Sequence, residues 1–148
     1  MKKAAQILIC MMAIFVLNGI SYAQDQKQEI PNIIKSGLNA YKEKGVQEVL
    51  KIWLKGSPLE GSKEALSQSN SFKQIEDMYG KYESYEVLKV NQLGIRTQQI
   101  YLVMHYTNGP LFCRFLTYQV KDGSVIDFFF FHTDPYQILP PSVMQNLK

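Results

Sequence analysis

Residues 100–132 decide the fold that this sequence predicts, and they read IYLVMHYTNGPLFCRFLTYQVKDGSVIDFFFFH. Asn108-Gly109 and Asp122-Gly123 divide this stretch into three β-rich runs, and both dipeptides are strong signals for two-residue hairpin turns. A fourth β-rich run comes just before them. The sequence therefore predicts four antiparallel strands, at residues 83–93, 97–107, 111–121 and 124–132.

The two turns also predict which side chains share a face of the sheet. With two residues in each turn, Cys113 pairs with Met104 on one side and with His132 on the other. One face is then almost wholly apolar and is expected to contact the helices; it carries Ile100, Leu102, Met104, Tyr106, Leu111, Cys113, Phe115, Ile126, Phe128 and Phe130. The outer face is mixed but too aromatic for a simply solvated surface; it carries Tyr101, Val103, His105, Phe112, Arg114, Leu116, Tyr118, Asp127, Phe129 and Phe131.

The strand at 83–93 needs a turn of odd length if Leu88 and Val90 are to face the helices. Gly94-Ile95-Arg96 supplies such a turn. The same register places Glu86 on the helix-facing side, near the start of the strand. A carboxylate there could act as a base with a raised pKa at the mouth of a cavity, or simply reach water at a strand end.

Apolar residues recur at helical spacing ahead of the strands. One stripe ends at Gly45 and a second at Lys55-Gly56; they comprise Ile30, Ile33, Ile34, Leu38 and Tyr41, then Val46, Val49, Leu50 and Trp53. Ser57-Pro58-Leu59-Glu60 is a capping box that predicts the start of a third helix, and residues 67–70 predict a break before a further capping box at Ser71. Helices followed by an antiparallel meander predict an α+β domain with the helices on one face of the sheet.

Residues 1–23 have the pattern of a cleaved signal peptide, with two lysines at the start and an apolar run at 7–17. Ser21 and Ala23 are the small residues that a signal peptidase recognises, so we expect cleavage after Ala23. The remaining chain, 24–148, is long enough for a single domain and is expected in the periplasm or outside the cell. No later apolar run approaches the ~18 residues of a membrane helix, so no membrane span is predicted there.

The charge balance argues against a nucleic-acid partner. The leader holds two of the 16 basic residues and none of the 13 acidic ones, so the processed chain has a net charge of about +1. Arg96 and Arg114 are the only arginines, and the sequence has no basic stripe of the kind that neutralises phosphates. Cys113 is the only cysteine after the leader, which excludes an intramolecular disulfide.

The end of the chain carries a family resemblance. Amphipathic helices ahead of a curved meander, closing on Asp127-Phe128-Phe129-Phe130-Phe131-His132-Thr133-Asp134-Pro135 and Ile138-Leu139-Pro140, resemble small exported members of the nuclear transport factor 2-like, or cystatin-like, superfamily. The resemblance covers roughly residues 30–141 and implies a cone-shaped space between helices and sheet. That superfamily includes isomerases, hydratases, transport factors and partner-binding modules, so the fold alone does not define a function.

Five residues are candidates for lining such a cavity: Trp53, Glu86, Tyr106, Cys113 and His132. Cys113 beside His132 could form a nucleophilic thiolate–imidazole pair, but a lone cysteine and a lone tryptophan on apolar faces are more often core residues. Asp127 and Tyr118 are predicted to pair across strands on the outer face. Isomerases of the superfamily use a carboxylate and a tyrosine inside the cone, so no catalytic residue is carried over to this pair. The sequence contains no linear motif for a metal or a cofactor, and none is expected.

Two hypotheses of function remain open. The first is a non-catalytic domain that binds a protein partner or an apolar ligand. The second is an isomerase- or hydratase-type enzyme that uses Glu86 with a tyrosine such as Tyr106. In either case the aromatic outer face predicts a homodimer, with interface candidates Tyr101, Arg114, Leu116, Asp127, Phe129 and Phe131. The competing expectation is a monomer in which residues 135–147 fold back over that face.

Overall fold

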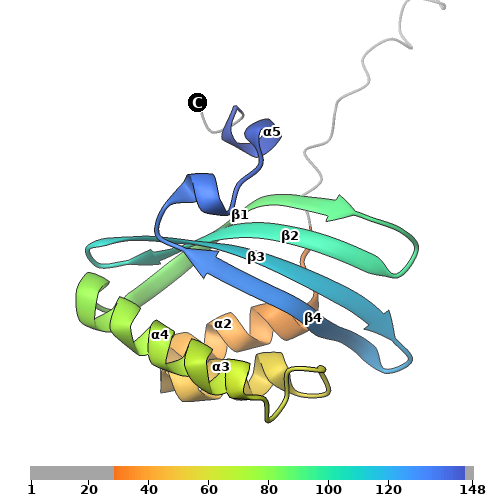
Figure 1. Cartoon of the computed structure of the whole chain (residues 1–148), viewed down its shortest axis with the longest axis horizontal. Coiled ribbons are helices and arrows are strands. Elements are labelled where there is room, and N and C mark those ends of the chain that lie inside the picture. The colour runs from red at the N-terminus through yellow and green to blue at the C-terminus, as the bar shows by residue number, and fades with distance from the viewer. Residues whose placement is uncertain (1–28, 146–148) are drawn as a thin grey trace, which may run out of the picture.

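The computed structural model describes residues 29–145 and confirms the α+β class. The predicted leader lies outside the described residues. The elements in chain order are the helices α2 (Asn32–Lys44), α3 (Val46–Leu54) and α4 (Lys63–Tyr79), the strands β1 (Tyr82–Gln92), β2 (Thr97–Tyr106), β3 (Gly109–Val120) and β4 (Gly123–His132), and the short helices η1 (Pro135–Gln137) and α5 (Pro141–Met144). The strands form one antiparallel sheet in the order β1-β2-β3-β4 (Figure 1).

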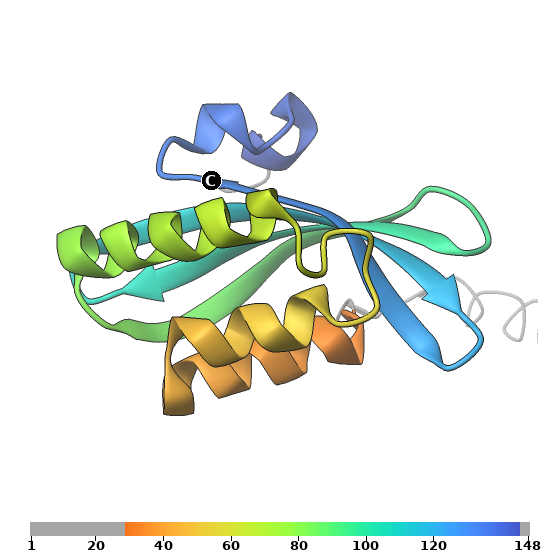
Figure 2. The ribbon, with the colours of Figure 1, turned by 60° about the horizontal axis from the view of Figure 1, so that its bottom comes forward.

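The sheet separates two layers of unequal size. Helices α2, α3 and α4 cover the inner face, while η1 and α5 lie on the outer face (Figures 1 and 2). The helices and the inner face share one apolar core, and the C-terminal residues form a second, smaller cluster with Tyr101. The prediction that residues after 135 fold back over the outer face is therefore confirmed for part of that face.

The capping box at Ser57 predicted the start of the third helix, but the helix begins later in the chain. Ser62 is the N-cap of α4, and its Oγ accepts a hydrogen bond from the Ala65 N–H at 3.1 Å. The Ser57 hydroxyl instead accepts from the Leu59 N–H within a turn. The break predicted at residues 67–70 is also wrong, because α4 is continuous there and Phe72 anchors it in the core.

The β2–β3 turn contains Thr107 and Asn108, not Asn108 and Gly109 as predicted, since Tyr106 pairs with Gly109. The end of α4 explains this position. The Asn108 N–H donates to the Tyr79 carbonyl at 2.8 Å, and the Thr107 N–H donates to the Lys81 carbonyl at 3.0 Å. The predicted pairing was displaced by two residues, so the predicted faces of β2 and β3 are unchanged.

A β-bulge in β4 reverses the predicted faces of its second half. Thr117 pairs with Ile126, but Leu116 pairs with Phe128, which leaves Asp127 as the extra residue. Because side chains alternate between faces, one extra residue transfers every later side chain to the opposite face. Phe129 is consequently 2% exposed in the core, whereas Phe128 and Phe130, predicted to be buried, are 43% and 41% exposed.

The β1–β2 turn confirms the predicted odd length, because the Leu93 N–H donates to the Thr97 carbonyl across Gly94-Ile95-Arg96. Val90 pairs with Ile100 and packs against the core, as predicted. A second irregularity between Val87 and Lys89 inserts Leu88 as an extra residue. Leu88 therefore packs with the C-terminal cluster on the outer face, which contradicts its predicted position.

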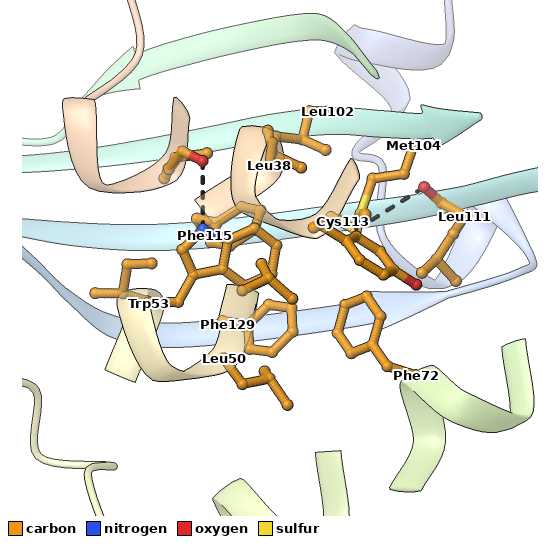
Figure 3. Close-up of a cluster of buried hydrophobic side chains, with 14 of the residues drawn as sticks. Leu38, Leu50, Trp53, Phe72, Leu102, Met104, Leu111, Cys113, Phe115 and Phe129 are labelled. Atoms are coloured by element: carbon orange, nitrogen blue, oxygen red, sulfur yellow. Dashed lines mark hydrogen bonds between the residues drawn. The ribbon is translucent and has the colours of Figure 1, made fainter. Parts of the chain in front are cut away.

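Trp53 lies at the centre of the core and joins the helices to the sheet (Figure 3). Its ring centroid is 4.9 Å from that of Phe115, 5.3 Å from that of Phe129 and 6.1 Å from that of Phe72. The indole N–H donates to the Ile34 carbonyl at 3.3 Å. Edge-to-face contacts of this kind add to the stabilisation from buried apolar area.

Candidate functional site

Cys113 is a core residue and does not pair with His132. It lies opposite Phe131, is fully buried, and places its Sγ 3.6 Å from the Met104 Sδ. Burial raises the pKa of the Cys113 thiol, so it stays protonated at neutral pH. His132 is exposed at the end of β4, and its Nδ1 accepts a hydrogen bond from the Asp134 N–H at 2.9 Å. The pairing failed for two reasons. The β3–β4 turn contains Lys121 and Asp122, not Asp122 and Gly123 as predicted, because Val120 pairs with Gly123. This moves the pairing by two residues and the β4 bulge moves it back by one, so His132 lies opposite Phe112.

Tyr106 belongs to a buried cluster of tyrosines. Its hydroxyl lies 3.0 Å from that of Tyr41, and the Tyr41 ring stacks on Tyr82 with centroids 4.8 Å apart. Burial raises the pKa of all three phenols above the ordinary value. The three phenols are therefore neutral at physiological pH, and the Tyr41 and Tyr106 hydroxyls are hydrogen-bonded to each other. The sequence analysis placed Tyr41 on an apolar helical stripe but gave no signal for this hydrogen bond.

Glu86 lies on the outer face, contrary to the prediction. It pairs with Val103, and its carboxylate is 3.9 Å from the His105 Nε2 in an exposed ion-pair geometry. The register differs from the predicted one because the irregularity at Leu88 shifts the first half of β1 by one residue. Glu86 and Tyr106 consequently lie on opposite faces of the sheet and cannot act on one substrate in a shared cavity.

One half of the outer face is covered by the C-terminal residues. Tyr101, an interface candidate, is only 4% exposed because it packs with Ile138, Leu139 and Val143. Asp134 directs the chain onto this face by capping η1, where its Oδ1 accepts from the Tyr136 N–H at 3.0 Å. This half of the face is an intramolecular contact.

The other half, over β3 and β4, is open. We call it the outer aromatic patch, and it consists of Arg114, Leu116, Asp127, Phe128 and Phe130. The Phe128 and Phe130 rings lie 6.5 Å apart, and the Arg114 guanidinium lies 5.6 Å from the Phe128 ring centroid. Asp127 is exposed, and Leu116, opposite Phe128, is half-buried. The patch thus contains two exposed aromatic rings together with one positive and one negative side chain.

Three of the six predicted interface residues belong to the patch; the other three are Tyr101, which is covered, and Phe129 and Phe131. Phe129 lies in the core and Phe131 packs against it, so both are absent from the outer face. Phe128 and Phe130 lie on the outer face instead. Tyr118 does not pair with Asp127, because it lies opposite Val125; its ring instead contacts the Arg96 guanidinium at 4.5 Å.

Between residues 29 and 145, no three histidine, cysteine, aspartate or glutamate side chains are grouped in a way that could hold a metal ion. No helix in the same part of the chain has the length and apolar character needed to cross a bilayer. Comparison of the chain with protein-family models, with curated proteins and with solved structures found no match.

Proposed function

We propose that this chain is a non-catalytic binding domain that forms a homodimer through the outer aromatic patch. The observation that carries the proposal is the exposure of Phe128 and Phe130, at 43% and 41%, beside a core that buries Phe129. Contiguous exposed apolar surface in a folded domain commonly marks an interaction site. Aromatic and arginine side chains are also enriched where protein interfaces are tightest.

The composition of the patch favours a second copy of the chain as the occupant. A two-fold contact places the same surface on both subunits, so the patch must be complementary to itself. Arg114 and Asp127 carry opposite charges within it, and a two-fold axis between the rings allows each arginine to meet the aspartate of the other subunit. The rings of the two copies would then pack against each other.

The inner face supports binding rather than catalysis as the role of the domain. The rings of Trp53, Phe72, Phe115 and Phe129 are in direct contact across the helix–sheet interface. An isomerase or hydratase would need an acid–base pair around a cavity there. The residues that this alternative required, Glu86 and Tyr106, lie on opposite faces instead.

Family and location are part of the same proposal. The helices that precede the meander, and the close of the sheet at residues 127–135, support a nuclear transport factor 2-like, or cystatin-like, roll. The leader pattern at residues 1–23 supports export to the periplasm or the medium.

Light scattering coupled to size exclusion tests the dimer on residues 24–148. We expect the wild type to have the mass of two chains and Phe128→Glu that of one chain, because a buried charge at the centre of an interface is costly. Leu66→Glu is the matched control, since Leu66 is a 70% exposed apolar residue on α4, in the helix layer. It should remain a dimer.

Two outcomes would contradict this proposal. A wild-type mass of one chain would exclude the homodimer and leave another protein as the occupant of the patch. A mass of two chains for all three proteins would place the contact on another surface. Circular dichroism of each variant verifies that it is folded.

A further inference from the structure

The β1–β2 and β3–β4 hairpins diverge at the end of the sheet beyond α2 and α3 (Figure 2). Residues of both hairpins line a polar hollow. It has a volume of about 150 Å³. The β1–β2 hairpin lines it with Gln92, Ile95, Arg96 and Gln98, and the β3–β4 hairpin lines it with Thr117, Gln119 and Ser124. Both hairpins therefore contribute to one site that lies outside the outer aromatic patch.

The hollow continues the inner face of the sheet, but with different chemistry. Ile100 and Phe115 are paired and fully buried in the core. Two residues further along each strand, Gln98 pairs with Thr117, and Gln98 also pairs with Gln92. The inner face thus changes within one row from apolar side chains to amides and hydroxyls, which both donate and accept hydrogen bonds.

Several polar side chains of the hollow are held by hydrogen bonds to a neighbouring side chain or to the backbone. The Ser124 hydroxyl donates to the Gln119 Oε1 at 3.0 Å, and Gln119 and Ser124 are cross-strand partners. The Thr117 hydroxyl lies 3.5 Å from the Gln98 carbonyl oxygen, and Thr117 is 2% exposed. Side chains ordered in this way lose less conformational entropy when a ligand binds.

Arg96 is the only charged side chain that lines the hollow among the described residues. Its Nε and Nη2 donate to the Gln119 carbonyl at 2.9 and 2.6 Å, and its guanidinium lies 4.5 Å from the Tyr118 ring centroid. The Gln119 N–H in turn donates to the Arg96 carbonyl at 2.7 Å. A guanidinium has five N–H donors, so this fixed group keeps donors for a carboxylate.

We propose that this hollow binds a small carboxylate that also carries hydroxyl groups. The guanidinium would pair with the carboxylate, and the amides and hydroxyls of both hairpins would bind the remaining polar groups. The volume equals that of about five liquid waters, which suits a molecule of a few carbon atoms. The site is separate from the proposed dimer contact, because none of its lining residues belongs to the outer aromatic patch.

Nuclear magnetic resonance titration of ¹⁵N-labelled residues 24–148 with L-tartrate tests the site. We expect saturable shifts of the Arg96 Nε–H and of the side-chain amides of Gln92, Gln98 and Gln119. Erythritol has the same four-carbon chain with a hydroxyl group in place of each carboxylate, so it should bind at least about tenfold more weakly, as expected when a charged partner is lost.

A variant of the guanidinium and a control in the helix layer test the site. Arg96→Gln should weaken tartrate binding about tenfold or more, whereas Lys73→Gln, which removes an exposed positive charge from α4, should leave it unchanged. Gln98→Leu retains Arg96 and should weaken binding severalfold, which keeps the test valid if Arg96→Gln disturbs its turn. A well-dispersed spectrum of each variant confirms that it is folded.

The proposal is overturned if tartrate causes no saturable shift up to about 50 mM, a concentration at which even millimolar affinity saturates. Equal binding of tartrate and erythritol would overturn recognition of a carboxylate. Unchanged affinity in both Arg96→Gln and Gln98→Leu would exclude the hollow as the site.

Discussion

The two faces of β4 carry the same type of side chain in different surroundings. Phe129 is 2% exposed and contacts Trp53, whereas its neighbours Phe128 and Phe130 are 43% and 41% exposed on the other side of the strand. Burial is therefore decided by the face that a residue occupies and not by its hydrophobicity. The bulge at Asp127 sets that face, since without it the alternation would be reversed.

The layers on the two faces also differ. Three helices cover the inner face and bury a continuous cluster of rings and aliphatic side chains. Within residues 29–145, the outer face is covered only by η1 and α5, which bury Tyr101 but leave Phe128 and Phe130 exposed. The inner face thus supplies most of the stability of the domain, and the outer face retains apolar surface for binding.

The strongest test of the difference between the two faces is to truncate one phenylalanine ring on each face. Phe129→Ala should reduce the free energy of unfolding by about 3–5 kcal/mol, the usual cost of removing a buried phenylalanine. Phe128→Ala, its exposed neighbour, should cost no more than about 1 kcal/mol. Urea unfolding followed by circular dichroism measures both, at a concentration low enough to keep the protein monomeric. Equal losses would show that the two faces are assigned incorrectly.

The packing of α2 against Trp53 gives a second test of the inner face. A Cβ added at Gly37 would lie 2.0 Å from the indole Nε1, so Gly37→Ala must displace the indole or the helix. Overpacking of this kind costs about 1–3 kcal/mol, and we expect the upper end. Gly94→Ala is the matched control, because a Cβ there meets no atom within 4 Å; it should change stability by less than about 0.5 kcal/mol. A harmless Gly37→Ala in thermal unfolding would contradict the close approach.

The buried tyrosines sharpen the comparison through pH. Burial raises the folded-state pKa of Tyr41 and Tyr106 above the ordinary value of 10.0, so above pH 10 the unfolded chain loses protons that the folded chain retains. Stability from these groups is therefore complete below pH 10 and falls as the pH rises, by at most about 1.4 kcal/mol per pH unit for each tyrosine.

Urea unfolding at pH 9 and pH 11 measures this loss of stability. Tyr106→Phe should show a smaller loss between the two values than the wild type, because one buried phenol is removed. Tyr136→Phe, which removes a phenol from a side chain that is 78% exposed, should behave as the wild type. Identical pH dependence in all three proteins would argue that Tyr106 is accessible to solvent.

Much of the architecture could be predicted from local signals. Alternating β-rich runs, Asn-Gly and Asp-Gly dipeptides and helical spacing predicted four strands after a helical half, as the structure has them. The odd turn at Gly94-Ile95-Arg96 followed from the need to bury Val90. Trp53 and Cys113 were recognised as possible core residues, because an isolated residue of either type on an apolar stripe is usually buried.

The candidate surfaces could not be predicted in the same way. Phe128 to Phe131 are four identical residues with no alternation, so nothing in their order reveals which of them face the helices. Leu88 and Glu86 lie on the outer face because of an irregularity in β1, and no turn residue in the sequence predicts that irregularity. Each error arises from one extra residue in its own strand, Asp127 in β4 and Leu88 in β1.

Local sequence thus specified the first two helices, the strands and their antiparallel order, because turn chemistry and side-chain periodicity depend on neighbouring residues. Tertiary structure decided the faces of β4, the position of the β2–β3 turn and the cover over Tyr101. Those features depend on contacts between residues far apart in the chain, such as the Asn108 N–H with the Tyr79 carbonyl at the end of α4. The physical reason is that a bulge or a docked tail is stabilised by the surface it packs against, which the local sequence does not contain.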